Sequence, residues 1–448
     1  MSSNSVTLTA REHVFPLFVK YVSANVLGMI GYSCYILADT FFVARGIGSD
    51  AIAALNLVLP AFSLLNGTGL MIGMGAAARY SLSSGRADSE IHRTIFTQAL
   101  QLAFVAMLFF FSIGLFFARP LCVLLGADGT TLPHAIPYIS ILLMFSPLFL
   151  CNNLLNCFVR NDGEPRLSMT AMLVGSLTNI VLDIAFVIGL HMGVAGAALA
   201  TILSQALSAV LVLWVLMRTK DMHRLELRKI RFDGRMFHRI IRIGLPAGLQ
   251  SVMYTSSNIL IQSSVNALGT DTVAAWTAYS KIDSLFWMIV NAFGISITTF
   301  VGQNFGAGKY HRMRKSVSVC MIMSMVSSAV MIILMYSFAP WIYRLFTTDS
   351  AVIVHGVHMS RFLLPSYFIY VIIGILSGAL RGTGKVLVPM LLTCGGVCSL
   401  RILWLFTAGQ MYPGINTIML SYPVSWSITA VLFIVYYFMK FPGKKKEN

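Results

Sequence analysis

Long apolar runs recur along the whole chain, and they constrain its fold more than any other feature. Each run has about 20 or more residues, enough for one helix to cross the ~30 Å hydrocarbon core of a bilayer. Of the 448 residues, 57% are hydrophobic and 11% are charged. Soluble domains carry about 25% charged residues, so this chain has too little polar surface for a soluble fold. It is predicted to be an all-α polytopic membrane protein.

The positions of the apolar runs predict twelve transmembrane helices. Membrane β-strands would be shorter, with about ten residues of alternating pattern, and these runs do not alternate. The expected spans lie near 15–44, 51–80, 93–117, 134–158, 167–190, 193–217, 241–267, 272–302, 316–341, 352–378, 386–408 and 415–439.

Basic residues are distributed unevenly between the two ends of these spans. The chain has 32 Lys and Arg against 16 Asp and Glu. Most of the bases fall on one side, above all in the loop 220–242 and the tail 444–446. Because cytoplasmic loops of membrane proteins are enriched in Lys and Arg, we expect both termini in the cytoplasm and the protein in the plasma membrane. These basic segments are interpreted as topology determinants, and no nucleic-acid partner is expected.

The chain also contains an internal repeat. Residues 47–54 match residues 268–275, and at the same offset Gly73 matches Gly294. The offset holds at further glycines and arginines along both halves. Six spans per half is an even number, so the halves should be parallel bundles related by a pseudo-two-fold axis along the membrane normal, as in many secondary transporters.

The repeat predicts three segments. Residues 1–219 form an N-terminal six-helix bundle that couples to a cation, 220–240 form a basic cytoplasmic linker, and 241–448 form a C-terminal bundle with a basic tail. Two different halves in one chain favour a carrier over a channel. The chain has no phosphate-binding glycine loop, zinc motif or nucleophile elbow, so neither an enzyme nor a bound cofactor is expected.

Three acids lie within apolar spans, where a carboxylate costs about 2.5–3.5 kcal/mol. They are Asp39, Asp183 and Asp283. Such residues are rare without a role in transport or proton relay. The alternative is a buried acid that only pairs with neighbouring hydroxyls.

Asp39 and Asp183 have further polar groups near them. Asn179 lies one helical turn before Asp183, and Thr201 follows a small-residue stripe that exposes the Ala197 carbonyl. At about 1.5 Å per residue, Asp39, Asp183 and Thr201 lie about 9–12 Å inside the outer ends of their helices. This all-oxygen set suits Na⁺, whereas two adjacent carboxylates could instead carry H⁺. No other metal is expected.

The second half of the chain lacks this set. At the repeat offset, Asp39, Asn179, Asp183 and Thr201 become Leu260, Leu400, Trp404 and Tyr422. An acid that only supported the repeat fold should persist in some form in both copies. The cation site is therefore predicted in the N-terminal half alone.

The remaining intramembrane charges are Asp283 with Lys281 and Arg401. Lys281 and Asp283 are two residues apart on one helix, so they point to different faces. Asp283 either attracts a cationic substrate or pairs with Lys281 or Arg401 in the folded bundle.

Several stretches along the chain carry a family resemblance, namely residues 38–42, 178–183, 193–201 and 301–308, with Gly48, Arg160 and Gly163. In these stretches the sequence resembles the multidrug and toxic compound extrusion (MATE) family, over essentially its whole length. The resemblance implies twelve helices in two bundles and export of organic cations in exchange for Na⁺ or H⁺. It also implies a cation site at Asp39, Asn179, Asp183 and Thr201. Unlike some relatives, this chain has no acid in residues 250–257 or 370–380.

The expected function is therefore secondary active multidrug efflux. The partners expected are small cationic drugs or dyes and the lipid bilayer, with a monomer as the working unit. The alternative within the same superfamily is a flippase for a lipid-linked oligosaccharide. A flippase would usually carry more cationic residues within its spans than Lys281 and Arg401.

Overall fold

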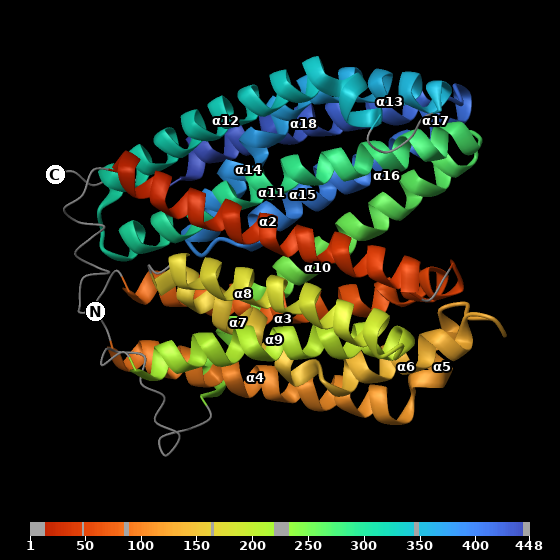
Figure 1. Cartoon of the computed structure of the whole chain (residues 1–448). Helices are drawn as coiled ribbons and strands as arrows, with labels where there is room; N and C mark the ends of the chain where they lie inside the picture. The colour runs from red at the N-terminus through yellow and green to blue at the C-terminus, as the bar shows by residue number, and fades with distance from the viewer. Residues whose placement is uncertain are drawn as a thin grey trace. The chain divides into compact units, whose positions relative to one another are not determined.

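The computed structural model describes residues 14–46, 49–84, 89–162, 165–218, 233–344 and 349–441 (Figure 1). Within these ranges the chain is almost entirely helical, with no β-strand. The described residues divide into two compact units. The first comprises residues 23–248, and the second comprises 14–22 together with 249–441.

The first unit is built from the helices of the N-terminal half. In chain order they are α2 (Val14–Gly46), α3 (Ser49–Ser84), α4 (Ser89–Phe116), α5 (Ala118–Leu124), α6 (Leu132–Met144), α7 (Ser146–Asp162), α8 (Pro165–Asp183), the π-helix η1 (Ile184–Gly189) and α9 (Gly193–Arg218).

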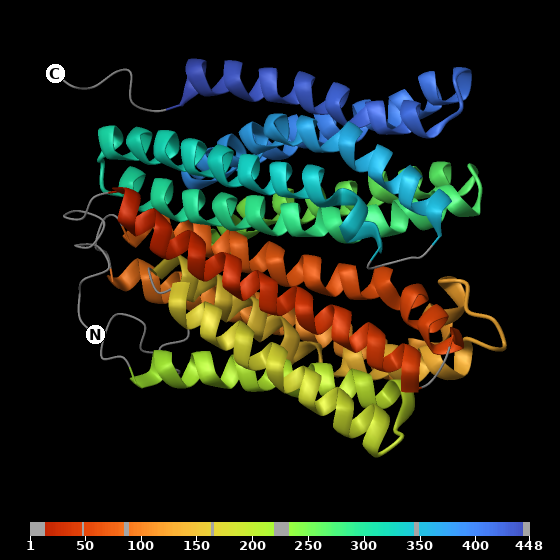
Figure 2. The same ribbon diagram turned by 45° about the horizontal axis from the view of Figure 1, so that its top comes forward.

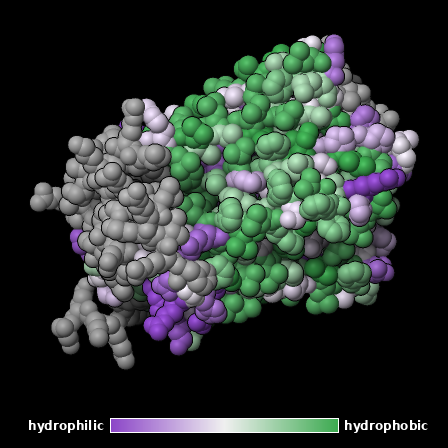
Figure 3. Space-filling model, turned by 90° about the horizontal axis from the view of Figure 1, so that it is seen from below, coloured by the Kyte–Doolittle hydropathy of each residue, from purple (hydrophilic) through white to green (hydrophobic). Residues whose placement is uncertain are grey.

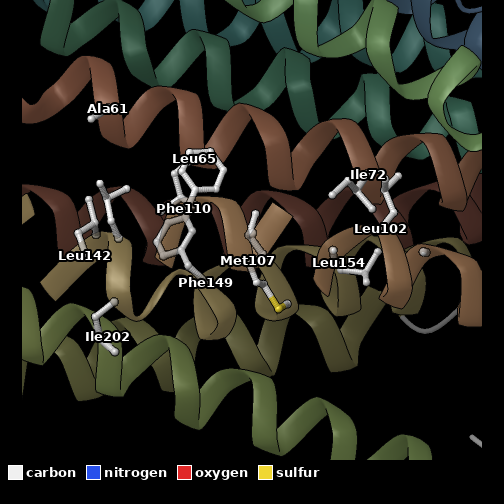
Figure 4. Packing of buried hydrophobic residues seen from close by; sticks show 14 of the residues in the cluster. Ala61, Leu65, Ile72, Leu102, Met107, Phe110, Leu142, Phe149, Leu154 and Ile202 are labelled. Atoms are coloured by element: carbon white, nitrogen blue, oxygen red, sulfur yellow. The ribbon is translucent and has the colours of Figure 1, made fainter. Parts of the chain in front are cut away.

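Apolar side chains from α3, α4, α6 and α7 fill the core of this unit. Figure 4 shows Leu65, Phe110 and Phe149 gathered between these helices. Many other large apolar side chains face outward, among them Phe104 and Phe109 on α4, each 59% exposed. The space-filling view shows a broad hydrophobic surface on this face, with hydrophilic residues gathered away from its middle (Figure 3). Surfaces of this kind are stable when lipid covers them.

The second unit is built from the helices of the C-terminal half. They are α10 (Gly234–Asn266), α11 (Thr270–Gly306), α12 (Tyr310–Arg344), α13 (Ser350–Leu363), the 3₁₀ turn η3 (Leu364–Ser366), α14 (Tyr367–Gly382), α15 (Leu387–Thr393), the π-helix η4 (Cys394–Ser399), α16 (Leu400–Phe406), α17 (Ala408–Met411) and α18 (Ile415–Lys440).

The twelve expected spans can be assigned to these elements. Ten of the described helical segments are long and apolar enough to cross a membrane. Helices α6 and α7 form an eleventh span that is bent by 53°. The twelfth is α10, whose 33 residues exceed the length needed to cross. Its hydropathy is lower because Gln250, Ser251 and Thr255 lie within it.

Two helices contribute to both units. The first turns of α2 pack in the second unit, where the Phe18 and Phe300 rings stack with centroids 4.1 Å apart. The rest of α2 packs on α8 in the first unit. The first turns of α10 pack on α3, where Gly75 and Gly244 allow the two backbones to approach closely.

Helix α10 begins inside the segment that was expected to be a linker. Residues 234–240, predicted to belong to the linker, form the first turns of α10. Asp233 explains this start, because its side chain accepts hydrogen bonds from the backbone N–H groups of Arg235 and Met236 at 2.9 and 3.2 Å. An aspartate in this position caps a helix. Residues 219–232 lie outside the described part of the chain.

Asp128 anchors the turn that leads into α6. Its carboxylate accepts hydrogen bonds from the backbone N–H and the hydroxyl of Thr131 and from the hydroxyl of Thr130, at 2.8–2.9 Å. Because these donors favour the ionised carboxylate, they hold the pKa of Asp128 well below its usual range. The turn thereby fixes the beginning of a helix that contributes to the site described next.

Candidate functional site

Helix α8 ends at the carboxylate expected to bind the cation. Asn179 and Asp183 are both fully buried on this helix. Immediately after Asp183 the backbone changes to the π-helix Ile184–Gly189. Such π-helical turns widen a helix locally and occur frequently at functional sites. Figures 1 and 2 show α8 and α9 as neighbouring helices of the first unit.

Hydrogen bonds through Asn179 connect α8 to Thr201 on α9. In one orientation of the amide, Asn179 Nδ2 donates to Thr201 Oγ1 at 3.4 Å. In the alternate orientation, the amide nitrogen donates to Asp183 Oδ2 at 3.1 Å, and the amide oxygen accepts from the Thr201 backbone N–H at 3.3 Å. The alternate orientation satisfies both amide atoms and one of the two Asp183 carboxylate oxygens, Oδ2. The structure thus brings three of the predicted residues together.

Asp39 on α2 completes the pair of carboxylates. It lies within electrostatic reach of Asp183. Asp39 Oδ1 and Asp183 Oδ1 are both buried, and neither has a hydrogen-bond partner. Buried polar atoms are nearly always paired, and unpaired ones cost free energy. Two such oxygens in one region are suited to a bound cation or to a shared proton.

Ala197 lies beside this cluster. It is fully buried and packs with Val187 and Val194, against the partly buried side chains of Leu55 and Tyr138. The packing places α9 next to the π-helical turn that follows Asp183. A role for the Ala197 carbonyl as a ligand stays a prediction.

Tyr138 on α6 belongs to the same site and was not predicted from the sequence. It lies within electrostatic reach of both Asp39 and Asp183. A usable signal was present in the repeat, because at the repeat offset Tyr138 becomes Met359. The hydroxyl of Tyr138 is therefore absent from the second copy, as are the carboxylates of Asp39 and Asp183.

We expect Tyr138→Phe to weaken coupling-ion binding without affecting folding. The substitution removes the hydroxyl and keeps the ring that packs against Ala197. Loss of one neutral hydrogen-bonding group should raise the half-saturating cation concentration for export by about 2–10-fold. Cation titrations of export in proteoliposomes measure this value. Tyr412→Phe, at a site that is 69% exposed, serves as the control and should leave it unchanged. An unchanged half-saturating concentration in Tyr138→Phe would exclude the hydroxyl from the site.

The predicted charges of the C-terminal half lie in the second unit. Asp283 on α11 accepts a hydrogen bond from Trp287 Nε1 at 2.9 Å and another from the Tyr367 hydroxyl. No ion pair within the described residues joins Asp283 to Lys281 or Arg401, so the expected pairing is not formed. Indole and hydroxyl donors satisfy the carboxylate instead. Lys281 is exposed, and Arg401 is buried over an aromatic ring.

The described residues contain no group of three or more His, Cys, Asp or Glu side chains that could hold a metal ion. The site in the first unit has two carboxylates, an amide and two hydroxyls. This is a hard oxygen set of the kind that binds alkali cations and protons rather than zinc or copper.

Comparison with known proteins identifies the family. The MatE family model matches residues 25–185 and 246–407. The chain belongs to the MatE family. The two matched stretches begin at repeat-related positions, which confirms the internal repeat. Because members of this family are transporters, the chain is a membrane transporter and not an enzyme.

Individual relatives of this MatE protein are distant but cover nearly its full length. It is 25% identical over 439 residues to the probable multidrug resistance protein YoeA of Bacillus subtilis (strain 168), covering 96% of this chain and 93% of the relative. It is 26% identical to the FAD transporter of Shewanella oneidensis, covering 90% of this chain and 89% of the relative. An outward-facing multidrug resistance MATE family transporter of the MOP superfamily has the same fold, with a TM-score of 0.92, 22% identity and 98% coverage of both chains.

Proposed function

We propose that this MatE protein exports cationic amphipathic compounds in exchange for Na⁺ or H⁺. The coupling ion binds at Asp39, Asn179, Asp183 and Thr201 in the first unit. The single observation that carries the proposal is the pair of buried, unpaired oxygens, Asp39 Oδ1 and Asp183 Oδ1. The names of relatives, which include a multidrug resistance protein, support the choice of cargo.

The proposed mechanism rests on charge compensation. Two carboxylates buried close together repel each other, and a bound Na⁺ or a proton removes part of this repulsion. The cation therefore favours the conformation that holds Asp39 near Asp183. Cargo binding must favour a different conformation, because a ligand shifts an equilibrium only through its differential affinity for the two states. Alternation between the two conformations would exchange cation for cargo.

The orientation follows from charge. The protein lies in the plasma membrane, and by the positive-inside rule both of its termini are in the cytoplasm. Cargo then leaves the cytoplasm as the cation enters. A monomer contains both halves and the whole proposed cation site.

The experiment that tests this function is transport by the purified protein in proteoliposomes. Sodium and pH gradients are imposed separately, with the membrane potential clamped, and uptake or release of a cationic dye is followed. We expect one gradient, and not the other, to drive the dye against its own concentration gradient. Absence of uphill transport under both gradients would contradict the proposal.

Parallel cargo assays separate the proposed function from its alternatives. FAD, suggested by the name of one relative, and a lipid-linked oligosaccharide are offered under the same gradients. Transport of the cationic dye alone supports drug export. Movement of the lipid-linked oligosaccharide without dye transport would instead indicate a flippase.

A further inference from the structure

The second unit contains a buried arginine that lacks a carboxylate partner. Arg401 on α16 is 2% exposed. Its guanidinium lies over the ring of Tyr422 on α18, with the guanidinium carbon 4.0 Å from the ring centroid. This cation–π contact stabilises the charge only in part, because it supplies no hydrogen-bond acceptor. An arginine buried in a membrane span normally has an acidic or carbonyl partner.

A second unsatisfied donor lies next to the same ring. Trp426 is 1% exposed, and its ring packs edge-on against Tyr422 with centroids 5.4 Å apart. Arg401 Nε and Trp426 Nε1 are both buried without a hydrogen-bond partner. Both groups donate only. Two unpaired donors around one ring require an acceptor that the described residues do not supply.

Two other tryptophans of this unit find acceptors within the protein. Trp287 Nε1 donates to Asp283 Oδ2 at 2.9 Å, and Trp404 Nε1 donates to the Thr417 carbonyl at 2.9 Å. Trp404 lies on the same short helix as Arg401. Trp426 differs from both in that its indole N–H has no acceptor.

The neighbouring polar groups do not complete the site. Asp283 lies within electrostatic reach of Arg401, but its two oxygens accept hydrogen bonds from Trp287 and Tyr367. The hydroxyls of Tyr254 and Tyr370 pair with each other at 3.2 Å. Arg381 on α14 donates to Ser377 at 2.9 Å through a terminal guanidinium nitrogen, and its Nε is also buried without a partner.

The backbone before Arg401 is also unusual. The π-helix Cys394–Ser399 ends two residues before it. Gly396 in this turn packs so tightly on α18 that a Cβ there would lie 2.2 Å from Thr429 Oγ1. This close contact packs the π-helix that leads into Arg401 directly against α18, which carries Tyr422 and Trp426. The first unit has the same feature beside its candidate site, where a π-helix directly follows Asp183.

We propose that Arg401 and Trp426 bind a monovalent anionic group, namely the carboxylate of an aromatic cargo that also carries a cationic group. Arg401 Nε and Trp426 Nε1 donate to the carboxylate, and the rings of Tyr422 and Tyr370 pack against the aromatic part. Tyr370 and Trp426 are already in contact, with centroids 5.2 Å apart. The proposal deepens the proposed export function and rests on it for the identity of the ligand as cargo.

The test is equilibrium binding of a matched dye pair to the purified protein, followed by fluorescence anisotropy. One dye is a rhodamine with a free carboxylate, and the other is the methyl ester of the same rhodamine. Arg401→Gln should weaken binding of the carboxylate dye by about tenfold, the effect of losing a hydrogen bond to a charged group. Binding of the ester should change less than about twofold. Trp426→Phe should produce a smaller loss for the carboxylate dye only.

Controls separate this site from general folding and from the export function. Arg361 also lies over a tyrosine, with its guanidinium carbon 5.3 Å from the Tyr336 ring centroid, but it is exposed. Arg361→Gln is therefore the matched control. It should leave both dyes unaffected. Arg401→Lys keeps the charge and should retain part of the selectivity. Because binding is measured without a gradient, failure of uphill transport leaves this result unchanged.

A chloride titration distinguishes cargo from a free ion. Competition between chloride and the carboxylate dye, present in the wild type and absent in Arg401→Gln, supports the site. The assignment to cargo would be overturned if chloride changed the tryptophan fluorescence of the wild type while Arg401→Gln left the binding of both dyes unchanged. Equal losses for the carboxylate and the ester, or no loss for either in a folded variant, would overturn the proposal as a whole.

Discussion

Asp183→Asn should abolish export while the protein remains folded in the membrane. The substitution keeps the size and shape of a side chain that lies fully buried at the end of α8. It removes the negative charge that a cation or a proton would compensate. Uphill dye export should therefore fall to the level of protein-free liposomes. The rate of export in proteoliposomes or in cells loaded with dye measures the effect.

Asp39→Asn should have the same effect, and the double variant should be no worse than either single variant, because the two residues act as one site. Asp271→Asn is a suitable control, since it removes an acid from the exposed first turn of α11. Export near the wild-type rate in Asp183→Asn, at equal amounts of protein in the membrane, would remove this carboxylate from the coupling mechanism.

Gly75→Ala should produce the largest loss of stability among conservative substitutions in α3. A Cβ at this position would lie 2.6 Å from the Ile240 carbonyl oxygen and 3.0 Å from the Gly244 backbone nitrogen. These are backbone atoms of α10, which cannot rotate away as a side chain can. Overpacking of this kind costs about 1–3 kcal/mol. The midpoint of thermal unfolding in detergent should therefore fall.

Gly67→Ala provides the matched control in the same helix. A Cβ at Gly67 would have no neighbour within 4 Å. Because alanine has a higher helix propensity than glycine, this variant should be neutral or slightly more stable. Equal midpoints for the two variants would show that the close approach of α3 and α10 does not limit stability.

Much of the fold follows from patterns that the sequence carries locally. Twelve apolar runs give the helices, and the family match at residues 25 and 246 confirms the repeat. The apolar span near 241–267 does not show where α10 begins, because the bases Arg235, Arg239 and Arg242 give its first turns the composition of a loop. The cap provided by Asp233 is a local signal for helix that outweighs them.

The candidate site was partly predictable for a different reason. A carboxylate within an apolar run is easy to recognise in a sequence. Because the second copy of the repeat has no acid at the positions of Asp39 and Asp183, the cation site is predicted in the N-terminal half. Tyr138 does not stand out, since tyrosine is common in membrane helices. Its position near both acids depends on how α6 packs on its neighbours, which no local pattern specifies.

The pairing of buried charges could not be predicted either. Asp283 was expected to bind cargo or to pair with a base, yet Trp287 and Tyr367 satisfy it. These donors come from one turn along α11 and from α14. Which of several donors reaches a carboxylate is decided by tertiary packing. The same holds for Arg401, whose missing acceptor becomes visible only when all its neighbours are placed.

The central claim is that the carboxylates of the first unit hold the ion that is exchanged for cargo. The most direct test reverses the reaction. A gradient of cationic dye is imposed across proteoliposomes without any Na⁺ or pH gradient, and movement of Na⁺ and of H⁺ is recorded. The wild type should drive one of these ions in the direction opposite to the dye, and Asp183→Asn should drive neither. Dye-driven ion movement that persists in the Asp39→Asn, Asp183→Asn double variant would contradict the claim.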